Sequence, residues 1–210
     1  MNDPSPRMRL RSLARTLYRK GWMEGTAGNL SLKTDEGLYI TASGCPKGSL
    51  SDRDILCIPL SESGSFLAGD RRPSAETSIH RILYRLFPET GAVLHVHTVE
   101  AALVSDFSGP ELKLPPLEVL KGLGIADPST RPAIPVFEND LLVTDIAEKI
   151  GTRLPDPRYP LPALLIRHHG TTVWGRTLDD ALRHLELAEF CFRALVMERS
   201  LDMKQEKSYQ

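Results

Sequence analysis

Apolar residues recur at helical spacing in four stretches of the chain. The first stretch is defined by Leu10, Leu13, Ala14 and Leu17. The segment Asp3-Pro4-Ser5-Pro6 can begin this helix and Gly21 can end it. The same spacing predicts helices after Ser74, which would be an N-cap, across residues 141–150, and after Thr177, where the pattern is clearest. The chain therefore has several amphipathic helices that need a common core.

Short β-prone runs lie between these helices, at residues 29–33, 37–41, 55–60, 92–96 and 163–166. The first three runs are separated by turn sequences rather than helices, which predicts strands joined directly by turns. Residues 108–135 are rich in Pro and Gly and have only a weak pattern. Because several strand pairs lack a helix between them, we expect an α/β/α sandwich around a mainly antiparallel or mixed sheet.

Length and composition limit the possible classes of protein. The 210 residues fit a single domain over residues 1–210, with a polar tail at about 203–210. Basic and acidic residues number 26 and 27, which argues against a general nucleic-acid-binding protein. No apolar run approaches the roughly 18 residues of a membrane helix. Three widely spaced cysteines form no CxxC pair, so we expect a reducing compartment, the cytoplasm.

Two groups of histidines indicate a metal site. His95 and His97 are two residues apart, so on a strand their side chains face the same side and can converge on one ion. His168 and His169 follow the apolar run 163–166, and only one of two successive residues can join the first pair. Three imidazoles with a fourth position open are typical of catalytic zinc. The alternative is a set of partly buried histidines bonded to the backbone.

Other polar groups are weaker signals. Residues 25–29 (Gly-Thr-Ala-Gly-Asn) and 41–44 (Thr-Ala-Ser-Gly) are turns whose N–H groups and hydroxyls can bind an anion, although each alone is more simply a turn. Glu76 and Glu118 lie in segments with few charges and are candidates for proton transfer near a metal, the alternative being solvated glutamates. The remaining histidines of the helical stretches, His80 and His184, are interpreted as structural or surface residues.

Together these segments resemble the class II aldolase family of zinc enzymes, of the fuculose-phosphate aldolase type. The resemblance extends from about Arg9 to Arg199, and it depends on the order and spacing of five elements. They are Thr26-Ala27-Gly28-Asn29-Leu30-Ser31, Ile40-Thr41-Ala42-Ser43-Gly44, Pro73-Ser74-Ala75-Glu76-Thr77, His95-Val96-His97-Thr98 and His169-Gly170. The resemblance implies one Zn²⁺ per subunit, a small-molecule sugar phosphate substrate and a homotetramer, with neither nucleic acid nor membrane as a partner.

Residues 83–88, 118–123 and 173–177 further resemble the dehydratase branch of this family. Its members convert 5-methylthioribulose 1-phosphate into 2,3-diketo-5-methylthiopentyl 1-phosphate and water in methionine salvage. The resemblance assigns roles to three sets of residues: zinc ligands His95, His97 and His169, the catalytic acid/base Glu118, and the substrate- or phosphate-binding residues Asn29, Ser43, Gly44, Ser74 and Glu76. Of the two adjacent histidines, His169 is chosen because it directly precedes Gly170.

Two alternative functions use the same residues differently. A sugar-phosphate aldolase or epimerase would keep the three histidines but use Glu76 as the acid/base, and the match at residues 118–121 favours the dehydratase over it. A catalytically silent module that binds zinc or a sugar phosphate is the second alternative. The complete set of ligands and the candidate acid argue against that module.

Overall fold

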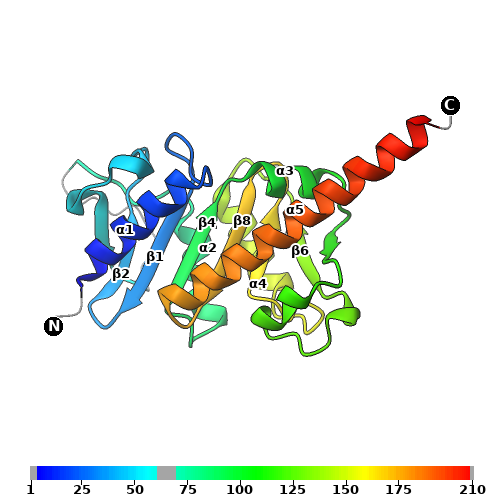
Figure 1. Cartoon of the computed structure of the whole chain (residues 1–210). Helices are drawn as coiled ribbons and strands as arrows, with labels where there is room; N and C mark the ends of the chain where they lie inside the picture. The colour runs from blue at the N-terminus through cyan, green and yellow to red at the C-terminus, as the bar shows by residue number, and fades with distance from the viewer. Residues whose placement is uncertain (1–3, 61–69, 209–210) are drawn as a thin grey trace.

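Eight strands form one sheet in the order β3-β2-β1-β4-β8-β7-β6-β5 (Figure 1). The computed structural model describes residues 4–60 and 70–208. Its strands are β1 (Asn29–Thr34), β2 (Gly37–Thr41), β3 (Ile55–Ile58), β4 (Ala92–Val96), β5 (Glu111–Lys113), β6 (Ala133–Phe137), β7 (Ala163–Ile166) and β8 (Gly170–Gly175). Only β6 and β7 pair in parallel, so the prediction of a mainly antiparallel, mixed sheet is confirmed.

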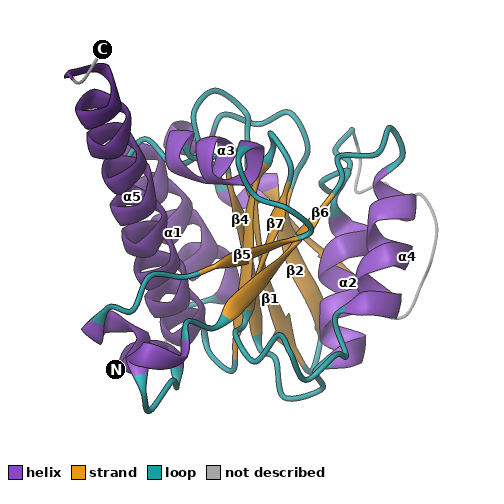
Figure 2. Cartoon of the chain, turned by 90° about the vertical axis from the view of Figure 1, so that its right-hand side faces the viewer, coloured by secondary structure: helices purple, strands orange, loops and turns teal. Residues whose placement is uncertain are grey.

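Helices cover both faces of the sheet. The α-helices are α1 (Pro6–Arg19), α2 (Thr77–Leu86), α3 (Val99–Asp106), α4 (Val143–Arg153) and α5 (Leu178–Ser208). Figure 2 shows α1 and α5 on one side of the strands and α2 and α4 on the other. The short 3₁₀ helices are η1 (Lys47–Ser49), η2 (Asp52–Asp54), η3 (Glu118–Leu123) and η4 (Pro128–Thr130). The predicted α/β/α sandwich is therefore confirmed.

The start of α2 differs from the prediction. The helix begins at Thr77 with Glu76 at the N-cap position, two residues after the predicted cap, Ser74. Ser74 is instead part of an extended segment, since its N–H donates to the Thr41 carbonyl oxygen at 3.2 Å. Its hydroxyl oxygen accepts a hydrogen bond from the Glu76 N–H at 3.3 Å. The prediction of Ser74 as the N-cap is therefore wrong, and Glu76 takes that place.

Other parts of the chain also differ from the sequence prediction, because α3, β5, β6 and β8 were not predicted and α5 is longer than expected. The central strand β8 was not predicted, because glycines bound its sequence Gly-Thr-Thr-Val-Trp-Gly and three residues separate it from β7. Helix α5 continues through most of the predicted polar tail 203–210, as far as Ser208 (Figure 1), and residues 209–210 lie outside the described part. Met, Lys, Gln and Glu are strong helix formers, and extending an existing helix is easier than starting one.

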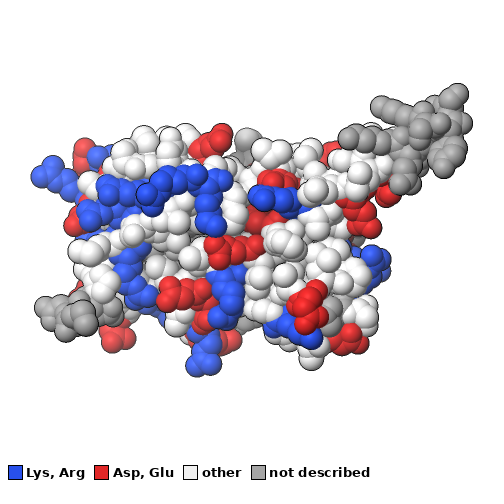
Figure 3. Space-filling model, in the orientation of Figure 1, with Lys and Arg blue, Asp and Glu red and all other residues white. Residues whose placement is uncertain are grey.

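Basic side chains gather over α1 on the face shown in Figure 3, and charges of both signs mix elsewhere on that face. Several of these arginines bind groups of the same chain. Arg7 donates to the Asp52 carbonyl oxygen at 3.0 Å, Arg11 forms an ion pair with the Asp52 carboxylate at 2.8 Å, and Arg15 donates to the Leu50 carbonyl oxygen at 2.7 Å. They thus attach α1 to the segment before β3. No described helix is both long and apolar enough to cross a membrane.

Candidate metal centre

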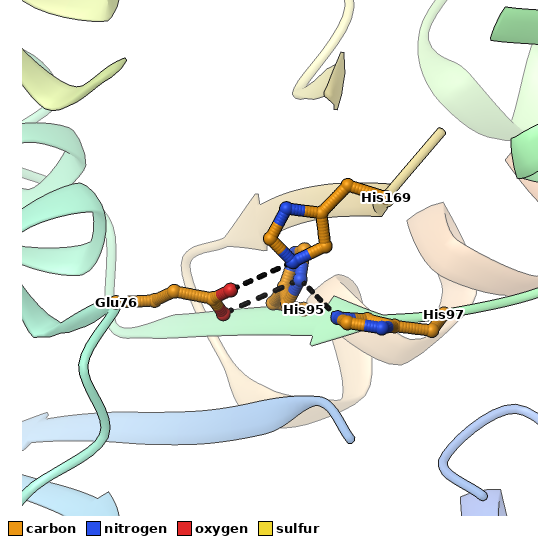
Figure 4. A group of neighbouring side chains, drawn as sticks. All are labelled: Glu76, His95, His97 and His169. Atoms are coloured by element: carbon orange, nitrogen blue, oxygen red, sulfur yellow. Dashed lines mark hydrogen bonds and ion pairs between the residues drawn. The ribbon is translucent and has the colours of Figure 1, made fainter. Parts of the chain in front are cut away.

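Four side chains from three parts of the chain meet at one end of the central strands (Figure 4). His95 lies in β4, His97 follows that strand, His169 lies in the turn before β8, and Glu76 precedes α2. One nitrogen or oxygen atom from each lies within 4.8 Å of those from the others. The pairing of β4 with β8 explains this, because it places the start of β8 beside the end of β4.

The inward-facing atoms are the Nε2 nitrogens of the imidazoles. His95 Nε2 lies 2.9 Å from His97 Nε2 and 3.3 Å from Glu76 Oε2. His169 Nε2 lies 2.8 Å from Glu76 Oε1. The opposite ring nitrogens are also occupied, since Nδ1 of His95 lies 2.9 Å from the Thr172 hydroxyl and Nδ1 of His169 lies 3.1 Å from Asn139 Oδ1. Such outer contacts fix the orientation of metal-binding imidazoles.

Burial sets the protonation states of the cluster. It lowers the pKa of His95 to about 4 and that of His97 to about 3, so both imidazoles are neutral near pH 7. Burial alone would raise the pKa of Glu76, but His95 and the hydrogen bonds from His169 and Asn29 outweigh it and hold the pKa well below its usual range. Neutral imidazoles and an ionised carboxylate are the forms that bind a metal cation.

The donor set fits a divalent metal. The Nε2 atoms of His95, His97 and His169 and the carboxylate of Glu76 all face one another. A divalent cation can accept a lone pair from each of these atoms. Three imidazoles and one carboxylate suit zinc, and imidazoles also accept iron, cobalt or manganese. Glu76 thus joins the three predicted histidines, and their role as zinc ligands stays a prediction.

His168 lies outside this cluster. Its backbone has a φ of +51°, in the left-handed region, and its N–H donates to the Ser105 hydroxyl at 2.9 Å. Its side chain is 60% exposed and its Nε2 lies 3.5 Å from the Asp106 carboxylate. The reversal of the chain at this residue directs His168 to the surface and His169 to the cluster.

The residues predicted to bind phosphate divide into two groups. Ser43 and Ser74 are brought together, because Ser43 N–H donates to the Arg72 carbonyl oxygen at 2.9 Å and Pro73 forms a bridge with Ala42. Gly44, next to Ser43, has a φ of +70° and no atom near the position of a side chain. Asn29 is different, since it is buried and its amide binds Glu76 and His80.

Lys47 is a buried cation that the sequence analysis missed. It is 1% exposed, and its Nζ donates to the carbonyl oxygens of Thr26 at 2.8 Å and Cys45 at 2.9 Å. The ammonium therefore connects the first turn interpreted as anion-binding, residues 25–29, to Cys45, which directly follows the second, residues 41–44. Among the described residues, no carboxylate forms an ion pair with it. A lysine in a Gly- and Pro-containing turn is normally exposed, so no sequence signal marked it.

Glu118 is not brought to the cluster within one chain. It begins η3, its side chain is 77% exposed, and its carboxylate accepts a hydrogen bond from Lys121 Nζ at 2.6 Å. Lys121 lines a cavity of about 800 Å³ together with Trp174. Trp174 lies near the Gly175 end of β8, whereas the cluster lies at the Gly170 end. Glu118 therefore does not join the cluster of its own chain, and its catalytic role stays a prediction.

His80 and His184 differ in their surroundings. His80 is fully buried and its two ring nitrogens contact Asn29 and Ser31. His184 is half-buried, and its Nδ1 lies 2.7 Å from the Trp174 carbonyl oxygen. Both surroundings agree with the interpretation of these histidines as structural residues. His80 is also connected to Glu76, because Asn29 contacts both side chains.

The chain is similar to known proteins over nearly its whole length. Residues 8–196 match the family model described as the Class II Aldolase and Adducin N-terminal domain. A protein of Microcystis aeruginosa named methylthioribulose-1-phosphate dehydratase is 50% identical over 93% of this chain and 96% of its own length. A protein of the same name from Leptospira biflexa is 38% identical over 87% of this chain and 92% of its own length.

A solved structure is similar in both sequence and fold. The L-fuculose-1-phosphate aldolase of Thermus thermophilus superposes with a TM-score of 0.75 at 26% identity, over 93% of this chain and 94% of that one. The order of the motifs, the mixed eight-stranded sheet and these matches all agree. The chain therefore belongs to the class II aldolase family, as the resemblance of its motifs predicts.

Proposed function

We propose that this chain is a metal-dependent hydro-lyase that converts 5-methylthioribulose 1-phosphate into 2,3-diketo-5-methylthiopentyl 1-phosphate and water. The observation that carries the proposal is the buried cluster of His95, His97, His169 and Glu76 in a chain that shares half of its residues with a relative of that name. The step belongs to methionine salvage. It breaks a C–H bond at C3 and a C–O bond at C4, and no carbon–carbon bond.

The cluster would hold one zinc ion through its three imidazoles, with Glu76 as a fourth donor. When bound, the ion supplies a Lewis acid that polarises oxygen atoms of the substrate. Ser43, Gly44 and Ser74 would bind the phosphate group through hydroxyls and backbone N–H groups, as the neighbouring turns allow. Lys47 donates to carbonyl oxygens of Thr26 and Cys45 and would add positive charge near these turns.

Glu118 would transfer protons at C3 and C4, protonating the departing C4 hydroxyl. Within one chain its carboxylate is exposed and lies outside the cluster. We therefore propose that it acts in the site of a neighbouring copy, within a homotetramer that has sites near its subunit boundaries. An exposed carboxylate on a short surface helix suits such a role, because contact with another copy would bury it. Together with the absence of a CxxC pair, the proposed pathway is consistent with the cytoplasm.

One observation favours a second candidate, a sugar-phosphate aldolase or epimerase. Glu76, and not Glu118, is the carboxylate that touches the histidines of its own chain. An aldolase of this fold would use Glu76 as the acid/base. The dehydratase is preferred because the relatives that are 50% and 38% identical carry that name, whereas the aldolase structure is 26% identical.

The decisive experiment combines metal analysis with assays on two substrates. Purified protein should contain about one zinc per chain and should release the diketone from 5-methylthioribulose 1-phosphate, with activity lost on chelation and restored by zinc. The second substrate is L-fuculose 1-phosphate, from which an aldolase would release a three-carbon phosphate. Cleavage of L-fuculose 1-phosphate without dehydration of the first substrate would replace the proposal with the aldolase.

A further inference from the structure

A row of buried polar side chains leads away from the metal cluster into the layer between β1 and α2. The row is Glu76, Asn29, His80, Ser31 and Tyr84, and none of the five is more than 9% exposed. Tyr84 Oη lies 2.8 Å from Ser31 Oγ, and Ser31 Oγ lies 2.7 Å from His80 Nδ1. His80 Nε2 lies 2.6 Å from Asn29 Oδ1, and Asn29 Nδ2 donates to Glu76 Oε2.

The spacing of side chains along helix α2 and along strand β1 explains why these residues meet. Glu76, His80 and Tyr84 are four residues apart, so they follow one face at the start of α2 and along it. Asn29 and Ser31 are two residues apart in β1, so they face the same side of the sheet. The strand residues alternate with the helix residues, and each fills the space between two of them.

The chemistry of these groups determines, for each hydrogen bond of the row, which partner donates and which accepts. Asn29 donates from Nδ2 to Glu76, which leaves its Oδ1 to face His80, and an amide oxygen can only accept. His80 Nε2 must therefore carry the proton. Complete burial lowers the pKa of His80 to about 3, so the ring is neutral and its Nδ1 is bare. Ser31 must then donate to Nδ1, and its own oxygen accepts from Tyr84.

We propose that Ser31 and His80 are positioning residues that make Asn29 present its amide N–H, and not its oxygen, to Glu76, and so hold the Glu76 carboxylate at the metal cluster. The inference rests on the proposed function only in that Glu76 belongs to the site. Neither residue touches the histidines of the cluster by any hydrogen bond in the described part of the chain.

The importance of the Ser31 hydroxyl follows from the case in which donors and acceptors along the row are exchanged. Without it, His80 Nδ1 loses its donor, and the ring can carry its proton on Nδ1 instead. Nε2 would then be an acceptor, and the Asn29 amide would turn to donate to it. That turn would place the Asn29 oxygen against the Glu76 carboxylate, where two acceptors repel each other. Removing one distant hydroxyl should therefore weaken the metal site.

The test uses three variants and two measurements that need no substrate. Ser31→Ala removes the donor to His80, and Tyr84→Phe removes the last hydroxyl but leaves Ser31 able to donate. Thr90→Val is the matched control, because Thr90 is 2% exposed and lies outside the row. Nitrogen-15 NMR of the metal-free protein reports which ring nitrogen of His80 is protonated. Competition with a chelator gives the zinc affinity, and thermal unfolding shows that each variant is folded.

Wild-type His80 should carry its proton on Nε2, and Ser31→Ala should raise the fraction of the tautomer that is protonated on Nδ1. The zinc affinity of Ser31→Ala should fall about 10- to 100-fold, the range typical of outer contacts to metal ligands. Tyr84→Phe should keep the wild-type tautomer and lose less affinity, and Thr90→Val should match wild type in both. A kcat effect larger than the KM effect should accompany the loss in Ser31→Ala at saturating zinc.

Two results would overturn the inference. The first is a wild-type His80 protonated on Nδ1, which needs no variant and so holds even where Ser31→Ala does not fold. The second is a folded Ser31→Ala protein with the zinc affinity of Thr90→Val. Both differ from failure of the proposed function, which would appear as wild-type protein that binds zinc and leaves 5-methylthioribulose 1-phosphate unchanged.

Discussion

The backbone of Gly170 lies so close to the carbonyl oxygen of Val96 that a Cβ atom on residue 170 would stand 2.1 Å from that oxygen. The same Cβ would lie 3.1 Å from Cδ2 of His97. Gly170 forms the first residue of β8, and Val96 the last residue of β4. The absence of a side chain at Gly170 thus allows the turn that carries His169 to reach His97.

Gly170→Ala should disturb both folding and metal binding. The added methyl group meets a backbone atom that cannot move aside, so β4 and β8 must separate at the cluster. Overpacking of this kind typically costs about 1–3 kcal/mol, and the zinc affinity should fall together with the free energy of unfolding. Urea unfolding and a zinc titration measure the two effects. Gly109→Ala is the control, because a Cβ there meets no atom within 4 Å.

Of the two adjacent histidines, only His169 should affect the metal content when it is replaced. His169→Ala removes an imidazole whose Nε2 faces the cluster, so zinc affinity should fall by at least about 100-fold, beyond the usual effect of outer contacts. His168→Ala changes an exposed side chain outside the cluster and should keep about one zinc per chain. Metal analysis after dialysis compares them. Full zinc in His169→Ala would show that the cluster is not the metal site.

The meeting of His95 and His97 could be predicted from the sequence because their geometry is local. Two residues apart on a strand face the same side whatever the rest of the fold does, and His95 and His97 do so here. The approach of His169 depends on the register of β4 against β8, which pairs Val96 with Thr171. No local pattern in the sequence contains that register: the position of His168 and His169 after an apolar run suggested a third histidine, and only the resemblance to a family chose His169.

The difference between local and non-local geometry also explains which features of the site the sequence did not predict. Glu76 was a candidate for proton transfer near a metal and was assigned to the substrate or phosphate, but its direct contact with His95 and His169 depends on how α2 packs against the sheet. Lys47 was missed because its burial comes from two turns that are separated in sequence and fold together over its side chain. Neither the composition nor the periodicity of apolar residues predicts packing between segments that are distant in sequence.

A pair of glutamate variants tests the division of catalytic roles. Glu118→Gln keeps the shape of the side chain but cannot exchange a proton, so the dehydration rate should fall by about 10²–10⁴ with zinc retained. Glu76→Gln should lower zinc affinity as well as activity, because Glu76 touches His95 and His169. Steady-state kinetics measure the loss of activity in each variant, and metal analysis measures the loss of zinc. A near-normal Glu118→Gln beside an inactive, zinc-containing Glu76→Gln would favour the aldolase-like use of Glu76.

Mixing of inactive variants tests whether Glu118 acts in a neighbouring copy. Glu118→Gln protein has an intact metal cluster, and His97→Ala protein has an intact Glu118. If Glu118 acts across a subunit boundary, unfolding the two together and refolding them with zinc should create sites with both intact parts and recover a measurable fraction of activity. Each variant refolded alone is the control. Failure to recover activity in mixed oligomers of proven composition would contradict the subunit arrangement and leave the chemistry of the cluster untouched.

Glu189 should make stability depend on pH. Its side chain is 4% exposed, and its Oε2 accepts a hydrogen bond from the Thr98 hydroxyl at 2.8 Å. Burial raises its pKa from 4.5 to about 7, and the nearby charge of Glu100 also raises it, against smaller lowering effects from Thr98, Thr171 and the charge of Arg193. Between these two pH values the folded protein keeps a proton that the unfolded chain has released. The free energy of unfolding therefore falls as the pH rises through that window.

Glu189→Gln should remove this loss of stability with rising pH, because the amide is neutral at every pH and its oxygen can still accept a hydrogen bond from Thr98. The variant should match wild type below about pH 4.5 and exceed it increasingly up to about pH 7, reaching roughly 3 kcal/mol for a shift of this size. Urea unfolding at a series of pH values measures the difference, with Glu100→Gln as the control at a less buried neighbour. A constant difference across the series would mean that Glu189 is already ionised in the folded protein near pH 5, and that its buried charge is balanced by a partner other than Thr98.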